Sequence, residues 1–141
     1  MDNEAKTREL NIEASTDNLR QVLDFVDGCL EEAGCPVKVQ MQIDVAVEEI
    51  FVNIASYAYA PATGDANVKI AIAEDEVNIT FSDSGIPYDP LAKEDPDITL
   101  SAGERPIGGL GIFMTKKMMD DVVYEYREGC NTLMLVKRFG E

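Results

Sequence analysis

Apolar residues recur along this chain with two different periods, and these periods divide it into predicted helices and strands. Steps of three or four residues, as from Ile43 to Val47, predict an amphipathic helix. Strict alternation, as from Val77 to Ile79, predicts a strand with one buried face. In chain order the pattern predicts a strand over Arg8–Ala14, a helix from Ser15 to Gly34, a helix over Val37–Ala60, a hairpin over Asn67–Ala73 and Glu76–Ser82, a helix over Gly111–Asp120, and a closing hairpin over Asp121–Tyr126 and Asn131–Phe139.

The order of these elements is typical of an α+β fold. We expect a two-layer α/β sandwich in which helices cover one face of a mixed, mainly antiparallel sheet. With 45% hydrophobic residues, the 141-residue chain has enough apolar surface for one core. We therefore expect a single domain over residues 1–141.

The composition narrows the classes of function. Lys and Arg number 12 against 27 Asp and Glu, and the resulting net charge of −15 repels nucleic acids and anionic membranes. No apolar run is long enough to span a bilayer. The chain has no His, which removes Ser–His and Cys–His nucleophile chemistry, and its three Cys lack a CxxC spacing. An odd number of Cys without a signal peptide is typical of reduced thiols, so we expect a cytoplasmic protein.

The segment before the last predicted helix is rich in glycine. Pro106–Gly111 carries three glycines in four positions, and a loop of about 20 residues, Asp83–Arg105, precedes it. Backbone N–H groups at the start of a helix bind phosphate oxygens, and glycine allows their close approach. The run is not a P-loop, because no Gly-Lys-Ser/Thr ends it, and Met114 stands where a dinucleotide fingerprint requires glycine. Taken alone, the run is also compatible with a tight turn.

Further polar residues stand at the edges of the predicted elements. Glu49 and Asn53 are four residues apart on one helix, so they lie on the same face. A carboxylate and a carboxamide placed in this way can hold Mg²⁺ or orient a hydroxyl, although the spacing is common on solvated helix faces. Asp83 ends a predicted strand, where a turn can direct its carboxylate towards an adenine amino group. Arg105 stands just ahead of the glycine run, where it can meet a terminal phosphate.

Together these motifs resemble the N, G1 and G2 boxes of the histidine-kinase-type ATPase superfamily, whose ATP-binding architecture is the Bergerat fold. Their order is a helix with Glu-x-x-x-Asn, a strand that ends in Asp-x-Gly, a long loop, and Gly-x-Gly at the start of a helix. More narrowly, the chain is similar to the anti-sigma-factor serine/threonine protein kinase family from about Leu10 to Phe139. The matching stretches are Val45–Asn53, Asp83–Pro90 and Gly108–Met114.

This resemblance implies a role for each motif in binding ATP and Mg²⁺. It implies that Asn53 helps to hold Mg²⁺ and that Glu49 is the catalytic general base towards the hydroxyl of a protein substrate. It also implies that Asp83 binds the adenine amino group and that Gly85 lets the base approach. The residues that the resemblance places at the phosphates are Arg105, at the γ-phosphate, and the run Gly108, Gly109, Leu110 and Gly111, in which Gly109 and Gly111 offer backbone N–H groups.

The chain departs from the family pattern at two places. Ser56-Tyr57 stands where members often carry His or Arg-His, and Cys130-Asn131 stands where a Gly-Thr pair often supports the adenine. We therefore expect Asn131 to substitute for that pair beside the adenine. The resemblance further implies that Leu91–Arg105 is the ATP lid.

The implied function is ATP-dependent phosphorylation of a serine on a small anti-anti-sigma partner of the STAS type. Members of the family alternately bind and inhibit a sigma factor, and many dimerise, so a homodimer is one assembly open to this chain. Two alternatives remain open from the residues themselves. One is a nucleotide-binding regulatory module without phosphoryl transfer, and the other is an interaction domain whose glycines are only turns.

Overall fold

The computed structural model describes residues 6–57, 64–73, 75–87, 89 and 110–139. Each predicted helix and strand is present, with its ends within a few residues of the prediction. The elements are β1 (Lys6–Glu13), a short 3₁₀ turn η1 (Thr16–Asn18), α1 (Leu19–Glu32), α2 (Val37–Tyr57), β2 (Asp65–Ile72), β3 (Glu76–Asp83), α3 (Leu110–Met118), β4 (Asp121–Arg127) and β5 (Cys130–Arg138).

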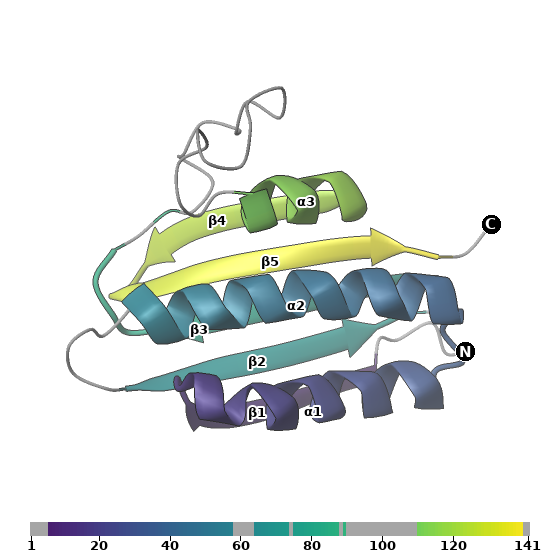
Figure 1. Cartoon of the computed structure of the whole chain (residues 1–141), viewed down its shortest axis with the longest axis horizontal. Helices are drawn as coiled ribbons and strands as arrows, with labels where there is room; N and C mark the ends of the chain where they lie inside the picture. The colour runs from purple at the N-terminus through teal and green to yellow at the C-terminus, as the bar shows by residue number, and fades with distance from the viewer. Residues whose placement is uncertain (1–5, 58–63, 74, 88, 90–109, 140–141) are drawn as a thin grey trace.

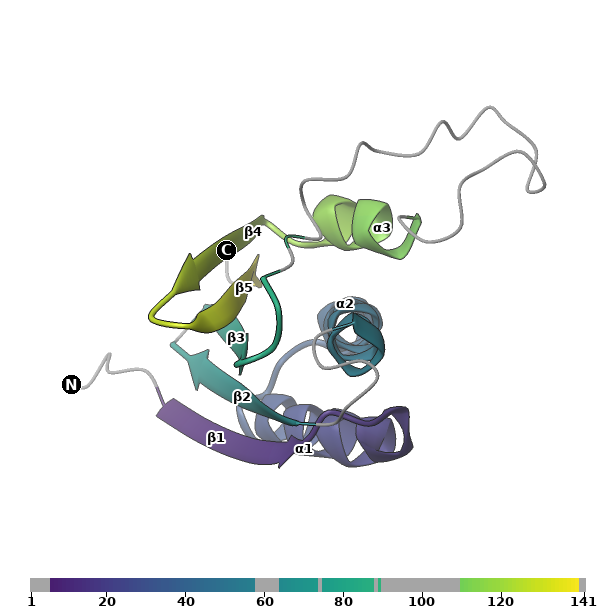
Figure 2. The same ribbon diagram turned by 90° about the vertical axis from the view of Figure 1, so that its left-hand side faces the viewer.

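The strands form one five-stranded sheet in the order β1-β2-β3-β5-β4, and the three helices lie on one face of it (Figures 1 and 2). This arrangement confirms the predicted α+β sandwich. The expected mixed sheet is corrected in one respect, because every neighbouring pair of described strands is antiparallel. The crossover from β3 through α3 gives β3 and β4 the same direction, but β5 lies between them and runs opposite to both.

The core lies between the sheet and the helices, and the alternation in the strands decides which residues enter it. In β3 every second residue is buried, from Val77 to Asp83. The largest side chains at the centre of this core are the fully buried Phe51 of α2 and Phe81 of β3. Burial of apolar surface of this kind makes the largest favourable contribution to the stability of a folded protein.

Two glycine-containing turns end α1 and join β4 to β5. After α1, Gly34 adopts φ +76°, the left-handed conformation that glycine takes without strain. The Cys35 amide then donates to the Leu30 carbonyl at 3.0 Å, and the Gly34 amide to the Glu31 carbonyl at 3.1 Å, which ends the helix sharply. Between β4 and β5, positive φ at Glu128 and Gly129 forms a tight two-residue turn, which closes the predicted hairpin.

The ends of four elements lie together at one end of the molecule. Figure 1 shows the C-terminal end of α2, the end of β3, the start of β5 and the start of α3 at the same end. The register agrees, because Asp83 at the end of β3 pairs with Asn131 near the start of β5. This end of the fold therefore gathers the described parts of the motifs that the sequence analysis singled out.

Candidate functional site

Asp83 occupies the last inward-facing position of β3. It continues the alternation of Ile79 and Phe81, so its side chain lies on the face of the sheet that carries the helices. Only 6% of the residue is exposed. A buried carboxylate is costly unless hydrogen bonds replace its lost water, so its partners decide what it can do.

One oxygen of the Asp83 carboxylate is held by two donors. Asp83 Oδ1 accepts a hydrogen bond from the Gly85 amide at 2.9 Å, which closes a local turn of the kind predicted for this segment. The same oxygen accepts a hydrogen bond from Asn131 Nδ2 at 2.9 Å. The other oxygen, Oδ2, has no hydrogen bond from any residue that the structure describes. The carboxylate is thus oriented through one oxygen, and among the described residues the second oxygen is an unused acceptor.

Asn131 links this cluster to two further groups. Its Nδ2 also donates to the Ile86 carbonyl at 2.8 Å, which ties the turn after β3 to the start of β5. Its Oδ1 accepts a hydrogen bond from the Tyr124 hydroxyl of β4. The sequence motifs placed Asp83, Gly85 and Asn131 at one site but did not single out Tyr124. Its position in the alternation of β4 puts it on the inward face, yet nothing in that pattern distinguishes it from Tyr126.

Glu49 and Asn53 form a second hydrogen-bonded pair on α2. Asn53 Nδ2 donates to Glu49 Oε2 at 2.8 Å and to the Glu49 carbonyl at 3.0 Å. Both side chains are half-buried, whereas the neighbouring Glu48 is exposed. These bonds orient the Glu49 carboxylate and turn the Asn53 amide so that its oxygen is not used within the pair. The two residues therefore form a half-buried, hydrogen-bonded pair on one face of the helix.

The donor set of this pair suits a hard cation. Within the described part of the chain, no group of three or more Asp, Glu, Cys or His could enclose a metal ion. Mg²⁺ is commonly held by one or two protein oxygens together with waters and substrate phosphates. Asn53 Oδ1 and one oxygen of Glu49 fit that requirement, because each is a hard oxygen ligand.

The predicted phosphate-binding residues are described only in part. Leu110 and Gly111 form the first turn of α3, as the prediction requires. Arg105, Gly108 and Gly109 lie outside the described residues, and so does the segment Leu91–Arg105 that was predicted to be the lid. The described start of α3 lies at the same end of the molecule as the end of β3 (Figure 1).

A different pair of acidic residues lies between α1 and α2. Asp27 of α1 and Asp44 of α2 each have a buried Oδ1 atom without a conventional hydrogen-bond partner. Burial, then the hydrogen bond and the charge of Asp27, raise the pKa of Asp44 from 3.8 to about 7. The protonated form of Asp44 is therefore favoured by burial and by the facing carboxyl group of Asp27. This pair is separate from the cluster around Asp83 and does not contribute to it.

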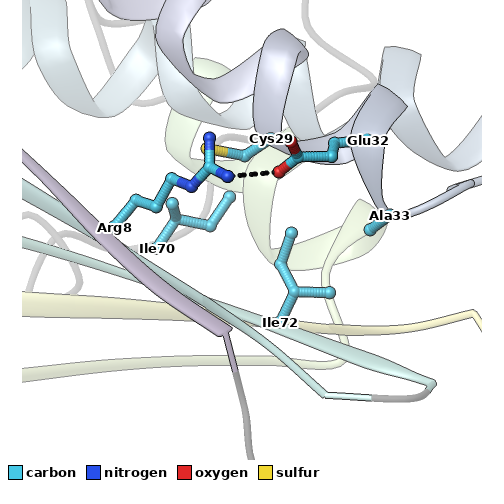
Figure 3. Close-up of a pocket in the computed structure, with 6 residues that line it drawn as sticks. All are labelled: Arg8, Cys29, Glu32, Ala33, Ile70 and Ile72. Carbon is cyan, nitrogen blue, oxygen red and sulfur yellow. Dashed lines mark hydrogen bonds and ion pairs between the residues drawn. The ribbon is translucent and has the colours of Figure 1, made fainter.

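Two hollows are alternative candidates for a binding site. The first, between α1 and the strands β1 and β2, has a volume of about 20 Å³, which is enough for about one water (Figure 3). Arg8 and Glu32 point towards one another there and form an ion pair at 2.5 Å, and burial raises the pKa of the Cys29 thiol beside them. This hollow is too small for a nucleotide.

The second hollow lies beside Asp83 at the end of the sheet and has a volume of about 360 Å³. A ligand of nucleotide size needs a pocket of this order. Two of its lining residues, Asn67 and Ser82, lie on the face of the sheet away from the helices. Glu49 and Asn53 are not among its described lining residues. The hollow leaves the Asp83 end of the sheet open to solvent. The hydrogen bonds around Asp83 define the candidate site more closely than this hollow does.

The chain matches known proteins over most of its length. A model of the family described as the histidine kinase-like ATPase domain matches residues 12–137. A serine-protein kinase RsbW of Listeria monocytogenes is 29% identical over 114 residues, which cover 77% of this chain and 73% of the relative. A serine-protein kinase RsbW of Bacillus cereus is 30% identical over 94 residues, which cover 64% of this chain and 59% of the relative.

A solved structure shares the fold. It contains the RsbU and RsbW domains of a protein from Mycobacterium tuberculosis and superposes with a TM-score of 0.69 at 18% sequence identity. The match covers 96% of this chain, which spans only 33% of that longer chain. Among the described residues, no helix has both the length and the apolar character needed to cross a membrane.

Proposed function

The chain belongs to the histidine kinase-like ATPase domain family, and we propose that it is an ATP- and Mg²⁺-dependent serine/threonine protein kinase of the anti-sigma type. Its similarity to the serine-protein kinases RsbW supports the kinase activity. We further propose that its substrate is a serine of an anti-anti-sigma partner of the STAS type, and that it regulates a sigma factor by exchanging partners. The cytoplasm is the proposed place of action, and the three free cysteines agree with a reducing compartment.

The observation that carries this proposal is the arrangement of Asp83. Hydrogen bonds from Gly85 and Asn131 hold one carboxylate oxygen and leave the other as an acceptor. An adenine amino group is a donor that suits such an acceptor, because a buried oxygen rejects a base that offers no donor there. We assign Asp83, Gly85 and Asn131 to adenine binding on this basis.

The roles that we assign to α2 follow from the Glu49–Asn53 pair. Asn53 Oδ1 would hold Mg²⁺, which when bound neutralises charge on the phosphates and brings the terminal phosphate into line. Glu49, oriented by Asn53, would accept the proton of the attacking serine hydroxyl. The N–H groups at the start of α3 would hold phosphate oxygens, with Gly108, Gly109 and Arg105 as further proposed contacts.

The kinase proposal is tested by phosphoryl transfer from labelled ATP to a cognate STAS partner. We expect Glu49→Gln to lower kcat about 10²- to 10⁴-fold, the usual contribution of a general base, while ATP affinity stays within about twofold. Glu48→Gln is the matched control, because Glu48 is the adjacent acid on the same helix but is exposed. It should leave both quantities unchanged.

Two results would count against the proposal in different ways. Wild-type protein that binds ATP but transfers no phosphate to any STAS partner would favour a nucleotide-binding regulatory module. Wild-type protein that does not bind ATP would favour the interaction domain. A serine-to-alanine variant of the partner should abolish labelling, and its failure to do so would mean that the acceptor is another residue.

A further inference from the structure

Tyr124 is a polar residue of the edge strand β4 that no motif in the sequence singles out. Its hydroxyl donates to Asn131 Oδ1, and the side chain is half-buried on the inward face of the sheet. A buried tyrosine hydroxyl normally finds a partner, but here the partner is itself the donor to Asp83. Tyr124 is therefore linked to Asp83, the residue proposed to bind the adenine amino group, by two hydrogen bonds through Asn131.

The three residues form a row across three neighbouring strands. Asp83 on β3 lies directly opposite Asn131 on β5, and Asn131 lies directly opposite Tyr126 on β4. Tyr124 lies two residues before Tyr126 and is therefore the diagonal neighbour of Asn131. The tyrosine side chain is long enough to reach across this diagonal. The resulting relay runs from the Tyr124 hydroxyl through the Asn131 amide to the Asp83 carboxylate.

The amide of Asn131 is fully engaged by this relay. Both of its donor positions are used, one towards Asp83 Oδ1 and one towards the Ile86 carbonyl, at 2.9 and 2.8 Å. Its oxygen accepts from Tyr124. Because Asn131 is only 7% exposed, the loss of the tyrosine donor would leave a buried oxygen without this bond. The amide would then rotate or shift towards other donors, and its hydrogen bond to Asp83 would weaken.

We propose that Tyr124 is a positioning residue of the adenine site, which orients Asn131 so that Asp83 keeps its Oδ2 directed at the 6-amino group of the base. This inference rests on the proposed ATP site and names a residue that acts on it from outside. Tyr124 itself need not touch the nucleotide. Its effect should be confined to ligands that carry the 6-amino group, because only these use Asp83 as an acceptor.

The test compares Tyr124→Phe with Tyr126→Phe by calorimetric titration with two nucleotides. Tyr126 is the matched control, because it lies on the same strand and face but is 47% exposed. The probes are ATP and purine riboside triphosphate, which differs from ATP only by lacking the 6-amino group. We expect Tyr124→Phe to weaken ATP binding about fivefold to tenfold, the usual size of one net hydrogen bond, and to leave the second ligand unchanged. Tyr126→Phe should change neither.

A double-mutant cycle provides the second measurement. In an Asn131→Ala background, Tyr124→Phe should have no further effect on ATP affinity, because the relay is already broken. The ratio of the two nucleotide affinities is unaffected by the stability of a variant, since both ligands are measured on the same folded protein.

The outcomes separate the two proposals. Wild-type protein that binds neither nucleotide would remove the ATP site and this inference with it. Wild-type protein that prefers ATP, together with a Tyr124→Phe variant that keeps the same preference, would overturn the role of Tyr124 alone. Equal weakening of both nucleotides by Tyr124→Phe would also overturn it, because that pattern indicates general damage to the pocket.

Discussion

Two aspartates withdrawn from solvent meet opposite surroundings in this protein. Asp83, at the end of β3, accepts two hydrogen bonds on one oxygen, from the Gly85 amide and from Asn131 Nδ2. Asp44, in the middle of α2, has a buried Oδ1 that lacks a conventional donor, and it faces the carboxyl group of Asp27. Asp83 is held by two hydrogen-bond donors, whereas Asp44 faces another carboxyl group.

The difference between them determines the chemistry that each can perform. Two donors fix the orientation of the Asp83 carboxylate, so it can serve as a fixed acceptor for a ligand. A second acid favours the protonated form, so burial and Asp27 raise the pKa of Asp44 to about 7. The first arrangement suits the proposed adenine site, whereas the second is expected to make the packing of α1 on α2 depend on pH. The comparison predicts that substitutions at Asp83 change binding, and that substitutions at Asp44 change stability.

The largest expected effect is that of Asp83→Asn on ATP affinity. The amide oxygen of the variant can still accept from Gly85 and Asn131, so the local structure should remain. The amide nitrogen then replaces the free oxygen and presents a donor to the donor on adenine. We expect ATP binding to weaken at least about 100-fold, with little change in melting temperature, as measured by calorimetric titration and thermal unfolding. An unchanged ATP affinity would remove Asp83 from the site.

Most of the helices and strands could be predicted from the sequence, but their pairing could not. Hydrophobic periodicity predicted the three α-helices and five strands that the structure describes, because apolar residues recur at regular spacing on most of their inward faces. The relative directions of neighbouring strands were predicted less well, because a mixed sheet was expected and every described pair is antiparallel. Periodicity describes one element at a time, and it does not say that β5 pairs with β3 on one side and β4 on the other.

The candidate site was predictable only where a motif marks a local arrangement. Glu49 and Asn53 are one helical turn apart, and the turn at Asp83 is closed by the amide two residues later, so short sequence spacing is enough. The hydrogen bond from Asn131 to Asp83 joins residues 48 positions apart and depends on the register of β3 and β5. The relay from Tyr124 depends on the same register, and so it could be found only in the folded chain.

The next largest effect is expected on the pH dependence of stability at Asp44. Its pKa in the folded protein is about 7, above the 3.8 of the unfolded chain, so the folded state binds more protons between these values. The contribution of Asp44 to stability is therefore present in full below about pH 4 and is lost as the pH rises towards 7. Asp44→Asn should remove this slope and melt about 3–5 °C higher than wild type above pH 7.

Thermal unfolding of wild type and variant between pH 5 and pH 8 measures this difference. Asp27→Asn should reduce the slope and lower its midpoint, because an amide can donate to the Asp44 carboxylate, whereas burial, the largest cause of the raised pKa, remains. Glu48→Gln is the control, since this exposed acid lies one turn from Asp44 on the same helix, and the slope should persist in it. A slope that is unchanged in both aspartate variants would mean that the pH dependence arises elsewhere. Neither aspartate variant should alter ATP affinity at neutral pH, which is the converse of Asp83→Asn.

The smallest expected effect is that of Arg20→Gln. This variant tests whether an exposed charge influences the pKa of Asp44 as strongly as the facing Asp27 does. Arg20 lowers the pKa of Asp44, but its side chain is 78% exposed and forms an ion pair with Asp24 at 3.4 Å. An exposed charge is screened by water and salt, so we expect the midpoint of the stability change to move up by less than about half a pH unit. In about 0.5 M salt the difference from wild type should vanish, whereas the effect of Asp27→Asn should persist, because the Asp27–Asp44 contact is buried. If Arg20→Gln instead shifts the midpoint more than Asp27→Asn does, the proton on Asp44 is governed by the surface charge of α1, and its contrast with Asp83 does not depend on the facing acid.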